Sequence, residues 1–220
     1  MKVAKLLVVV TLALLLATTF SADPDLLQDL CVADFASGVN VNGFTCKEAS
    51  KVNVTDFFSN ILAKPGGTPN TYGLSVTGAN VEKVAGLNTL GVSLARIDFA
   101  PGGLNPPHTH PRATEIVFVL QGQLEVGFIT TANELMSMII NEGDIFVFPK
   151  GLVHFQNNNA NVAAAVISAF NSQLPGTQSI ATTLFAATPS VPDHVLTKTF
   201  QVGTNEVQEI KSRFPVPPKN

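Results

Sequence analysis

Short apolar runs separated by turn-forming residues fill the middle of this chain, and no other feature restricts the fold as strongly. Runs rich in Val, Ile, Leu and Phe alternate with breaks that contain Gly, Asn or Pro. Short strands with turn signals about every eight to twelve residues are typical of antiparallel sandwiches and barrels. The sequence therefore predicts a fold dominated by β-strands, with strands at residues 92–100, 115–120, 124–129, 136–140, 145–148 and 163–170.

The residue composition agrees with many short elements joined by tight turns. The 220 residues include 14 Pro, 16 Gly and 15 Phe but no Trp, which disfavours a helical bundle. Charged residues make up 13% of the chain, too few for an intrinsically disordered protein. The net charge of −3 argues against a nucleic-acid partner, because phosphate binding needs clustered Lys and Arg.

The first residues have the layout of a secretory signal peptide. Lys2 and Lys5 precede an apolar run at 6–17, and small and polar residues follow up to Ala22. A membrane anchor is the alternative, but the run is shorter than the ~20 residues that a spanning helix needs. We expect residues 1–22 to be removed, after Ala22 or Ser21, and the mature chain to be exported without a membrane anchor.

The mature chain, 23–220, is expected to be one domain, and its residue pattern changes twice, which defines three parts. The N-terminal part is irregular, with a short predicted helix near 54–61 and a loop at 64–73. The C-terminal part has helical spacing, which is clearest at Val207, Ile210 and Phe214. Such a helix packs on its own sheet or against a neighbouring subunit. The three parts are an N-terminal extension, a barrel core and a helical segment, at residues 23–85, 86–172 and 173–220.

Two features of the extension fit an exported protein. Cys31 and Cys46 are the only cysteines, and an oxidising compartment favours a disulfide between them over two free thiols. Closing a loop of this size is worth ~3 kcal/mol in the chain-entropy model. Asn53, in Asn53-Val54-Thr55, is in the chain's single N-glycosylation sequon.

Three histidines and one glutamate form the candidate functional site. His108 and His110 are two residues apart, so on a strand both side chains point to one face. Glu115 is an odd number of residues further on, and Pro111 can supply the break that turns it inward. His154 must come from a neighbouring strand. His194, which follows Pro192-Asp193, is expected to lie in a polar turn without a role.

A divalent cation explains why these groups would converge. Burying three imidazoles and a carboxylate is costly unless a charge neutralises and orders them. Three nitrogens and one oxygen leave two positions of an octahedron for water or substrate, which suits a catalytic metal. The ligands alone do not distinguish Mn from Zn, Fe, Cu or Ni. The alternative is a set of unrelated histidines.

Two spaced motifs surround this site. They read Gly102-x5-His108-x-His110-x4-Glu115-x6-Gly122 and Gly143-x5-Pro149-x-Gly151-x2-His154-x3-Asn158. These motifs resemble the two motifs of the cupin superfamily. The stretch from Pro106 to Glu115 looks like the corresponding box of plant germins and germin-like proteins, as do residues 23–29 and the placement of the two cysteines.

This resemblance implies a single double-sheet jelly-roll barrel with C-terminal helices. It also implies manganese bound by His108, His110, Glu115 and His154, and a secreted homohexamer, a trimer of dimers, whose C-terminal helices pack against neighbours. The location would be the apoplast or cell wall. The motif glycines, Gly102, Gly122, Gly143 and Gly151, would form tight turns where a side chain would collide.

Three functions fit the resemblance. Superoxide dismutation, with a role in defence or stress, requires only a redox metal that attracts a small anion. Oxalate oxidation in germins uses two asparagines near the metal, of which Asn105 is present as a possible substrate contact. The other position holds Ala95, which cannot bond a carboxylate, so we expect no oxalate oxidase activity. The third function is a non-enzymatic extracellular binding protein or receptor.

Overall fold

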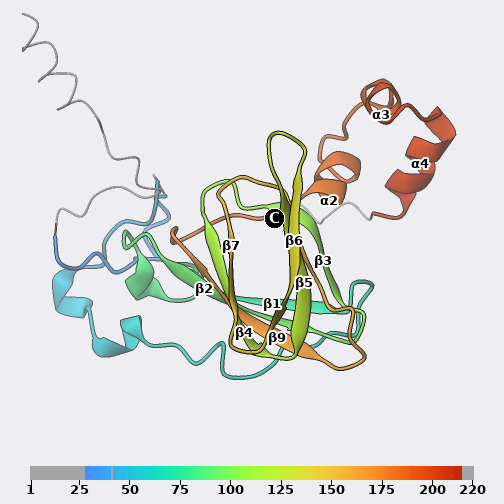
Figure 1. The fold of residues 1–220 in the computed structure, drawn as a ribbon. Coiled ribbons are helices and arrows are strands. Elements are labelled where there is room, and N and C mark those ends of the chain that lie inside the picture. Colours follow the sequence, from blue (N-terminus) through green and yellow to red (C-terminus); the bar gives the residue numbers. More distant parts are fainter. Residues whose placement is uncertain (1–27, 41, 215–220) are drawn as a thin grey trace, which may run out of the picture.

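Two five-stranded antiparallel sheets face each other and enclose a barrel (Figure 1). The computed structural model describes residues 28–40 and 42–214, so the expected signal peptide lies outside the described residues. One sheet has the order β1-β2-β9-β4-β7 and the other β10-β3-β8-β5-β6, which confirms the predicted double-sheet barrel. The strands are β1 (Leu74–Ala79), β2 (Ser93–Phe99), β3 (Leu104–Thr109), β4 (Glu115–Gln121), β5 (Gln123–Ile129), β6 (Leu135–Asn141), β7 (Ile145–Phe148), β8 (His154–Asn157), β9 (Ala164–Phe170) and β10 (Gln178–Ser179).

The barrel extends beyond the expected core of 86–172 at both ends. Strand β1 pairs with β2 before the expected start, and the short β10 pairs with β3 after the expected end. Polar residues and a glycine interrupt the apolar pattern of β1, so its sequence gives no strand signal. Strand β3 contains Pro106 and Pro107, which cannot donate ladder hydrogen bonds, and its pairing with β8 is irregular there.

Alternating burial along the strands builds the apolar core between the sheets. In β4, Val117 and Val119 are buried while Ile116 and Phe118 are exposed, as expected for period-two alternation. Burying each such side chain contributes roughly 1.5–3 kcal/mol. Glu115 begins the same inward row, so the polar centre continues the core. The core cluster comprises Ile97, Phe99, Val117, Val119, Leu124, Val126, Ile140, Phe148, Ala164 and Val166.

A disulfide closes a loop within the N-terminal segment, and Asp98 on β2 links that segment to the barrel. Cys31 and Cys46 are joined, with Cα atoms 4.7 Å apart, which confirms the predicted pairing. Arg96 Nη2 lies 2.9 Å from Asp98 Oδ1, and Asp98 Oδ2 accepts a 2.8 Å hydrogen bond from the backbone N–H of Gly66. The Gly66–Asp98 hydrogen bond holds the segment before β1 against the first sheet, and the ion pair with Arg96 orients the Asp98 carboxylate.

The short helix expected near 54–61 is only one turn long. Within 54–61 the structure has the 3-10 turn η2 (Val54–Phe57). Another 3-10 turn, η1 (Ala49–Lys51), comes before it, and η3 (Ala85–Leu87) precedes β2. Asn53 caps η2, because its Oδ1 accepts a 2.9 Å bond from the N–H of Thr55, and Asp56 Oδ2 accepts from the N–H of Asn53 at 3.0 Å. Asn53 is exposed, and the chain leaves the helical conformation at Phe58.

Three helices follow the barrel: α2 (Ile180–Phe185), α3 (Asp193–Phe200) and α4 (Thr204–Ser212). Helices α3 and α4 pack on each other and extend away from the barrel (Figure 1). Leu196 and Val207 are buried there. His194 lies exposed in the first turn of α3 rather than in a polar turn, because that helix begins at Asp193. Among the described residues, no helix has the length and apolar character needed to cross a membrane.

The motif glycines are required mainly for their backbone conformation. All four have positive φ, between 72° and 88°, a region that L side chains rarely adopt. A Cβ on Gly122 would meet the carbonyl oxygen of Ala163 at 2.9 Å, whereas the space around the other three is open. The expectation of a collision is therefore correct at Gly122 and wrong at Gly102, Gly143 and Gly151.

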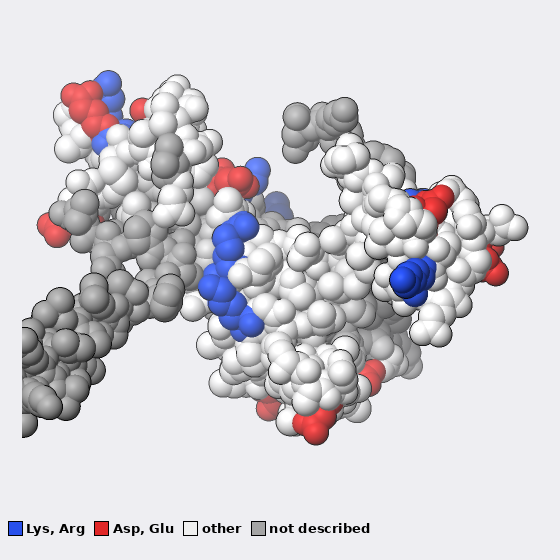
Figure 2. Space-filling model, turned by 90° about the horizontal axis from the view of Figure 1, so that it is seen from above, with Lys and Arg blue, Asp and Glu red and all other residues white. Residues whose placement is uncertain are grey.

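Charged side chains are sparse on the surface seen in Figure 2. Lys and Arg occur there in small groups with uncharged surface between them. This agrees with the low charged fraction of 13%.

Candidate metal centre

Two neighbouring strands of one sheet, together with a strand of the facing sheet, bring the four predicted ligands together. His108 on β3 pairs directly with His154 on β8, and His110 follows the end of β3. Glu115 begins β4 after the turn that contains Pro111. The predicted break between His110 and Glu115 is therefore present, and it moves Glu115 into the other sheet, from which its side chain faces the histidines.

The four side chains form one compact, buried cluster. Each is at most 6% exposed, and one ligand atom from each lies within 4.8 Å of those of all the others. Glu115 Oε2 is 3.0 Å from His110 Nε2 and 3.2 Å from His154 Nε2. The ring centroids of His108 and His154 are 4.1 Å apart. Spacing in the sequence predicted this convergence.

Backbone carbonyls orient all three imidazoles. A carbonyl oxygen can only accept a hydrogen bond, so each Nδ1 donates, and each Nε2 is left to bind either a proton or a metal ion. Metal-ligating histidines characteristically have this arrangement. The Nδ1 distances are 2.8 Å from His108 to Pro106 O, 2.6 Å from His110 to Gly176 O and 2.8 Å from His154 to Leu152 O.

The electrostatics of the cluster fit a cation. Burial, followed by the nearby His154, lowers the pKa of His108 to about 4, so this ring is neutral at neutral pH. Burial alone would raise the pKa of Glu115, but hydrogen bonds with His110 and His154 more than offset it and hold that pKa well below its usual range. A proton between one Nε2 and Oε2 would relieve the repulsion between only those two acceptor atoms. A metal ion would bind one ligand atom from each of the four residues together.

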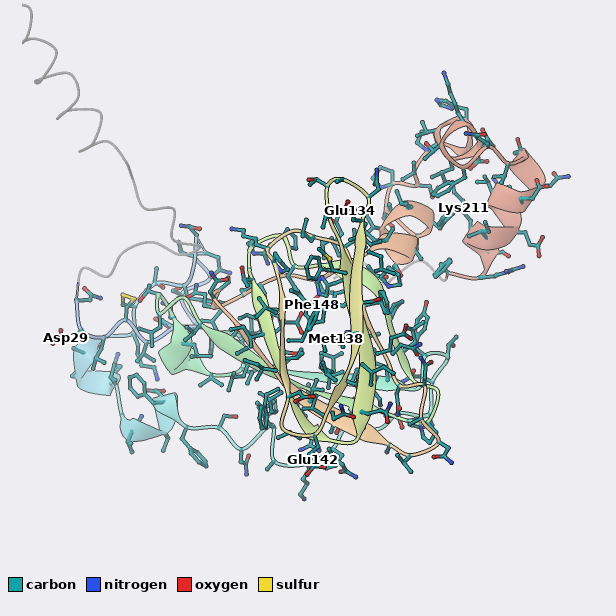
Figure 3. The ribbon with its side chains drawn as sticks, viewed as in Figure 1. Asp29, Glu134, Met138, Glu142, Phe148 and Lys211 are labelled. Atoms are coloured by element: carbon teal, nitrogen blue, oxygen red, sulfur yellow. A yellow bond between two sulfur atoms is a disulfide. The ribbon has the colours of Figure 1, made fainter. Side chains whose placement is uncertain are left out.

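Two phenyl rings support the imidazoles. Phe148 stacks on His154 with ring centroids 4.5 Å apart, and Phe170 meets His110 edge-on at 4.8 Å. Figure 3 shows Phe148 inside the barrel. Sequence reasoning missed both supporting roles, because the pairs depend on strand packing. Phe148 ends a predicted strand, so its burial was foreseeable but its partner was not.

Ser168 and Gln156 are further side chains at the centre that sequence reasoning missed. Glu115 Oε1 accepts a 2.7 Å bond from Ser168 Oγ and a 3.1 Å bond from Gln156 Nε2. Gln156 Oε1 in turn accepts a 2.8 Å bond from Asn105 Nδ2. Gln156 lies two residues after His154, so strand alternation could have placed it on the inner face.

A small cavity of about 120 Å³ reaches the centre. Asn105 and Ala95 lie in its wall together with His108, His110 and Glu115. Asn105 lines this cavity, and its amide also bonds Gln156; its contact with a substrate stays a prediction. The remaining wall is largely apolar and includes Ile97, Leu94 and Val76. The cavity size favours a small ligand.

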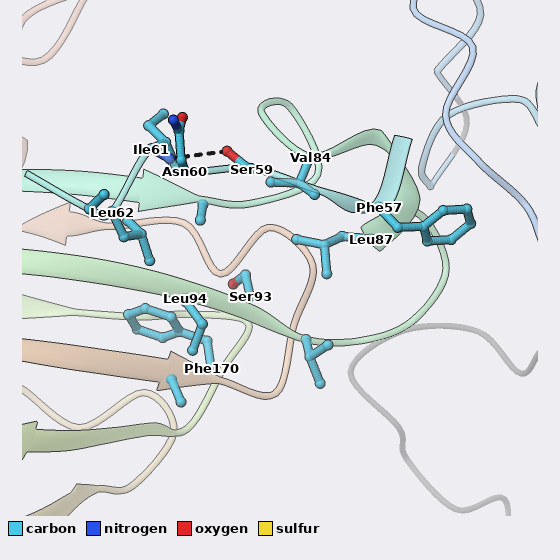
Figure 4. A pocket seen from close by; sticks show the side chains of 14 residues that line it. Phe57, Ser59, Asn60, Ile61, Leu62, Val84, Leu87, Ser93, Leu94 and Phe170 are labelled. Atoms are coloured by element: carbon cyan, nitrogen blue, oxygen red, sulfur yellow. Dashed lines mark hydrogen bonds between the residues drawn. The ribbon is translucent and has the colours of Figure 1, made fainter. Parts of the chain in front are cut away.

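A larger apolar cavity of about 800 Å³ lies beside the centre (Figure 4). It lies between the segment around Leu62 and the strands that carry Leu94 and Phe170. Leu94 and Phe170 line both cavities, so they separate the larger space from the candidate centre.

The fold and the centre define a cupin: a double-sheet β-barrel with a buried cluster of three histidines and one carboxylate. The Cupin family model matches residues 59–208. The chain belongs to the germin-like proteins of plants within this superfamily. It is 65% identical to germin-like protein subfamily 2 member 4 of Arabidopsis thaliana, over 93% of both chains. It is 69% identical to germin-like protein 5-1 of Oryza sativa subsp. japonica, over 94% of this chain and 92% of the relative.

Two further relatives bear on function. The rhicadhesin receptor of Pisum sativum is 70% identical, over 86% of this chain and 88% of the relative. A solved structure of oxalate oxidase matches with a TM-score of 0.85 and 47% identity, covering 87% of this chain and 98% of that one. Oxalate oxidase therefore shares the fold of this chain.

Proposed function

We propose that this chain is a secreted manganese-binding germin-like protein with superoxide dismutase activity and a role in plant defence or stress. The observation that carries the proposal is the buried cluster in which three carbonyl-oriented imidazoles and one ionised carboxylate face one point. His108, His110, Glu115 and His154 would hold the ion. When bound, manganese supplies the one-electron couple that dismutation needs.

The side chains around the centre suit a small anion. Three neutral imidazoles and one carboxylate leave a divalent ion with net positive charge, which attracts anions through a low-dielectric cavity. The cavity of about 120 Å³ has largely apolar walls, so it offers few bonds to a larger polar substrate. Superoxide needs no such bonds, because charge and size alone select it.

The proposal is tested on one purified sample, by elemental analysis and by a superoxide-decay assay. We expect bound manganese and accelerated decay. His108→Ala and His154→Ala should each abolish both metal and activity. His194→Ala, at an exposed histidine on α3, is the matched control and should retain both. Dismutation that survives complete metal removal would contradict the assignment.

Oxalate oxidation is the second candidate, because the solved oxalate oxidase shares the fold at 47% identity. Asn105 is in the cavity wall, but Ala95 offers neither a donor nor an acceptor to a carboxylate. We expect no peroxide release when oxalate is added to metal-replete protein. A binding or receptor function is the third candidate, supported by the relative named rhicadhesin receptor; it would be favoured by metal-loaded protein that is inactive in both assays.

We also propose that the protein assembles as a homohexamer, a trimer of dimers, in the apoplast. Strands β6 and β7 are sheet edges and expose large apolar side chains, among them Met138 (Figure 3) and Ile145. Apolar edge strands need a covering partner, and α3–α4 extends away from its own barrel (Figure 1). Sedimentation should give six subunits, and Ile145→Glu should reduce the number. Mass spectrometry of the secreted protein tests the expected glycan on the exposed Asn53.

A further inference from the structure

We infer that Ser168, together with Gln156, is a positioning residue for the carboxylate of Glu115. The two residues hold one carboxylate oxygen away from the metal, so that only the other oxygen faces it. This inference rests on the proposed metal binding. It concerns how the carboxylate binds, not whether it binds.

The two oxygens have different surroundings. Oε2 faces the Nε2 atoms of His110 and His154, at 3.0 and 3.2 Å. Oε1 accepts bonds from Ser168 Oγ at 2.7 Å and Gln156 Nε2 at 3.1 Å. Ser168 and Gln156 are both fully buried, at 0% exposure. Two protein donors therefore occupy the oxygen that does not face the histidines.

Ser168 is the polar member of an otherwise apolar row. Every second residue of β9 points inward, and Ala164, Val166 and Phe170 are the other buried members of that row. A buried hydroxyl is costly unless it is hydrogen-bonded, and the partner of this one is Glu115. A serine at this position in a barrel core is thus explained by the carboxylate on the adjacent strand β4.

Gln156 is oriented by a second bond. Asn105 Nδ2 donates to Gln156 Oε1 at 2.8 Å, which leaves Nε2 of Gln156 to face Glu115. The chain Asn105–Gln156–Glu115 therefore runs from the cavity wall to the centre. Asn105 contributes to the position of the carboxylate in addition to lining the cavity.

These bonds determine how many coordination positions of the metal ion the carboxylate can occupy. Carboxylates bind metals through one oxygen or through both. Hydrogen bonds to an ionised acceptor are about twice as strong as neutral ones, so two of them hold Oε1 away from the ion. Without the hydroxyl, only Gln156 holds Oε1, so this oxygen turns more readily toward the ion and takes a coordination position otherwise open to water or substrate. Removing such outer partners typically weakens metal binding about 10–100-fold.

The test compares variants of the full secreted chain that differ in one hydroxyl. Ser168→Thr and Ser168→Val have the same shape, but only the threonine can donate. Mn²⁺ titration should give a Kd for Ser168→Thr within about threefold of wild type, and a Kd about 10–100-fold higher for Ser168→Val. The proton relaxivity of bound Mn²⁺ should fall by about half in Ser168→Val, because one of two exchangeable positions is lost.

Two controls separate positioning from packing. Ser172 is also buried, at 2% exposure, and its Oγ accepts from the N–H of Leu174 at 3.2 Å, so Ser172→Ala should leave affinity and relaxivity unchanged. Ser168→Ala, unlike the threonine and valine variants at position 168, adds no bulk. If the added methyl group prevents those two variants from folding, Ser168→Ala is compared with Ser172→Ala. Loss of affinity and relaxivity in Ser168→Ala alone is then the expected result.

The outcomes distinguish the two claims. If wild type binds Mn²⁺, and removing the hydroxyl changes neither affinity nor relaxivity, the positioning role is overturned and the proposed metal binding stands. If wild type binds neither Mn²⁺ nor Zn²⁺, both are overturned.

Discussion

The phenyl ring of Phe148 lies nearly parallel to the imidazole of His154, with centroids 4.5 Å apart and planes inclined by 22°. Phe148 also belongs to the apolar core and is 1% exposed. One side chain therefore links the packing of the barrel to the orientation of a candidate metal ligand, so a change in the core should alter the centre.

Phe148→Ala should lower the free energy of unfolding by about 3–5 kcal/mol, because it removes a buried ring and leaves a cavity. It should also weaken Mn²⁺ binding, since the His154 ring loses its stacking partner. Urea unfolding and metal titration measure the two effects. Phe58→Ala, at a side chain that is 71% exposed, should change stability by less than about 0.5 kcal/mol. Equal effects of the two variants would contradict the argument.

The Cys31–Cys46 disulfide should contribute about 3 kcal/mol to stability, because it closes a short loop in the unfolded chain. Replacing both cysteines by serine should lower the urea midpoint accordingly. Wild type treated with a reductant is the matched control and should unfold at the same midpoint as the double variant. An unchanged midpoint in both would mean that the bond adds nothing to the stability of the barrel.

Local patterns predicted the features that depend on local sequence. The apolar runs gave the ranges of strands such as β4 and β7 to within a residue or two, and i, i+2 spacing placed His108 and His110 on one face. The apolar runs gave no range for β3, because its two prolines contradict the usual strand pattern. The i, i+2 argument nevertheless placed a strand at the histidines, and β3 contains His108 and ends just before His110. The barrel boundaries at 86 and 172 were too narrow for a related reason, since β1 and β10 carry weak apolar patterns.

The contacts that orient the centre could not be read from local sequence. Ser168 is 53 residues from Glu115, and Gln156 is 41 residues from it. Their approach depends on which strands become neighbours. A lone serine in a strand is ordinarily a surface residue, so Ser168 carries no signal without the barrel around it. The i, i+2 spacing from His154 indicates an inward side chain for Gln156, but it does not identify Glu115 as its partner.

Acid should loosen the α3–α4 pair. Hydrogen bonds from Lys211 and then Gln208 lower the pKa of the Asp193 carboxyl below its ordinary value of 3.8, and Lys211 Nζ lies 2.7 Å from Asp193 Oδ1. A lowered folded-state pKa stabilises the helices above pH 3.8, and that contribution is lost as the pH falls through the folded value. The protection of the backbone amides in α3 and α4, measured relative to their intrinsic exchange rates at each pH, should therefore fall below pH 3.8.

Asp193→Asn is the control for this acid effect. Asparagine has no carboxyl to protonate in this range, so the variant should exchange faster than wild type at neutral pH. The difference between the two proteins should close as the pH falls. Wild-type protection that is insensitive to acid would rule out a contribution from the Asp193–Lys211 pair.

Ala95→Asn is the substitution that should introduce oxalate oxidation. Ala95 is buried on β2 and lies in the wall of the same small cavity as Asn105 and His108. An asparagine amide would supply the donor that the wild-type methyl lacks, and losing a comparable orienting bond costs on the order of 10²–10³ in rate. We expect oxalate-dependent peroxide release at least about tenfold above the wild-type background, with manganese content unchanged. Ala95→Leu, which has nearly the same size but no polar atoms, should release none. Equal peroxide release from the two variants would show that filling the cavity, and not a hydrogen bond from position 95, determines whether oxalate is oxidised.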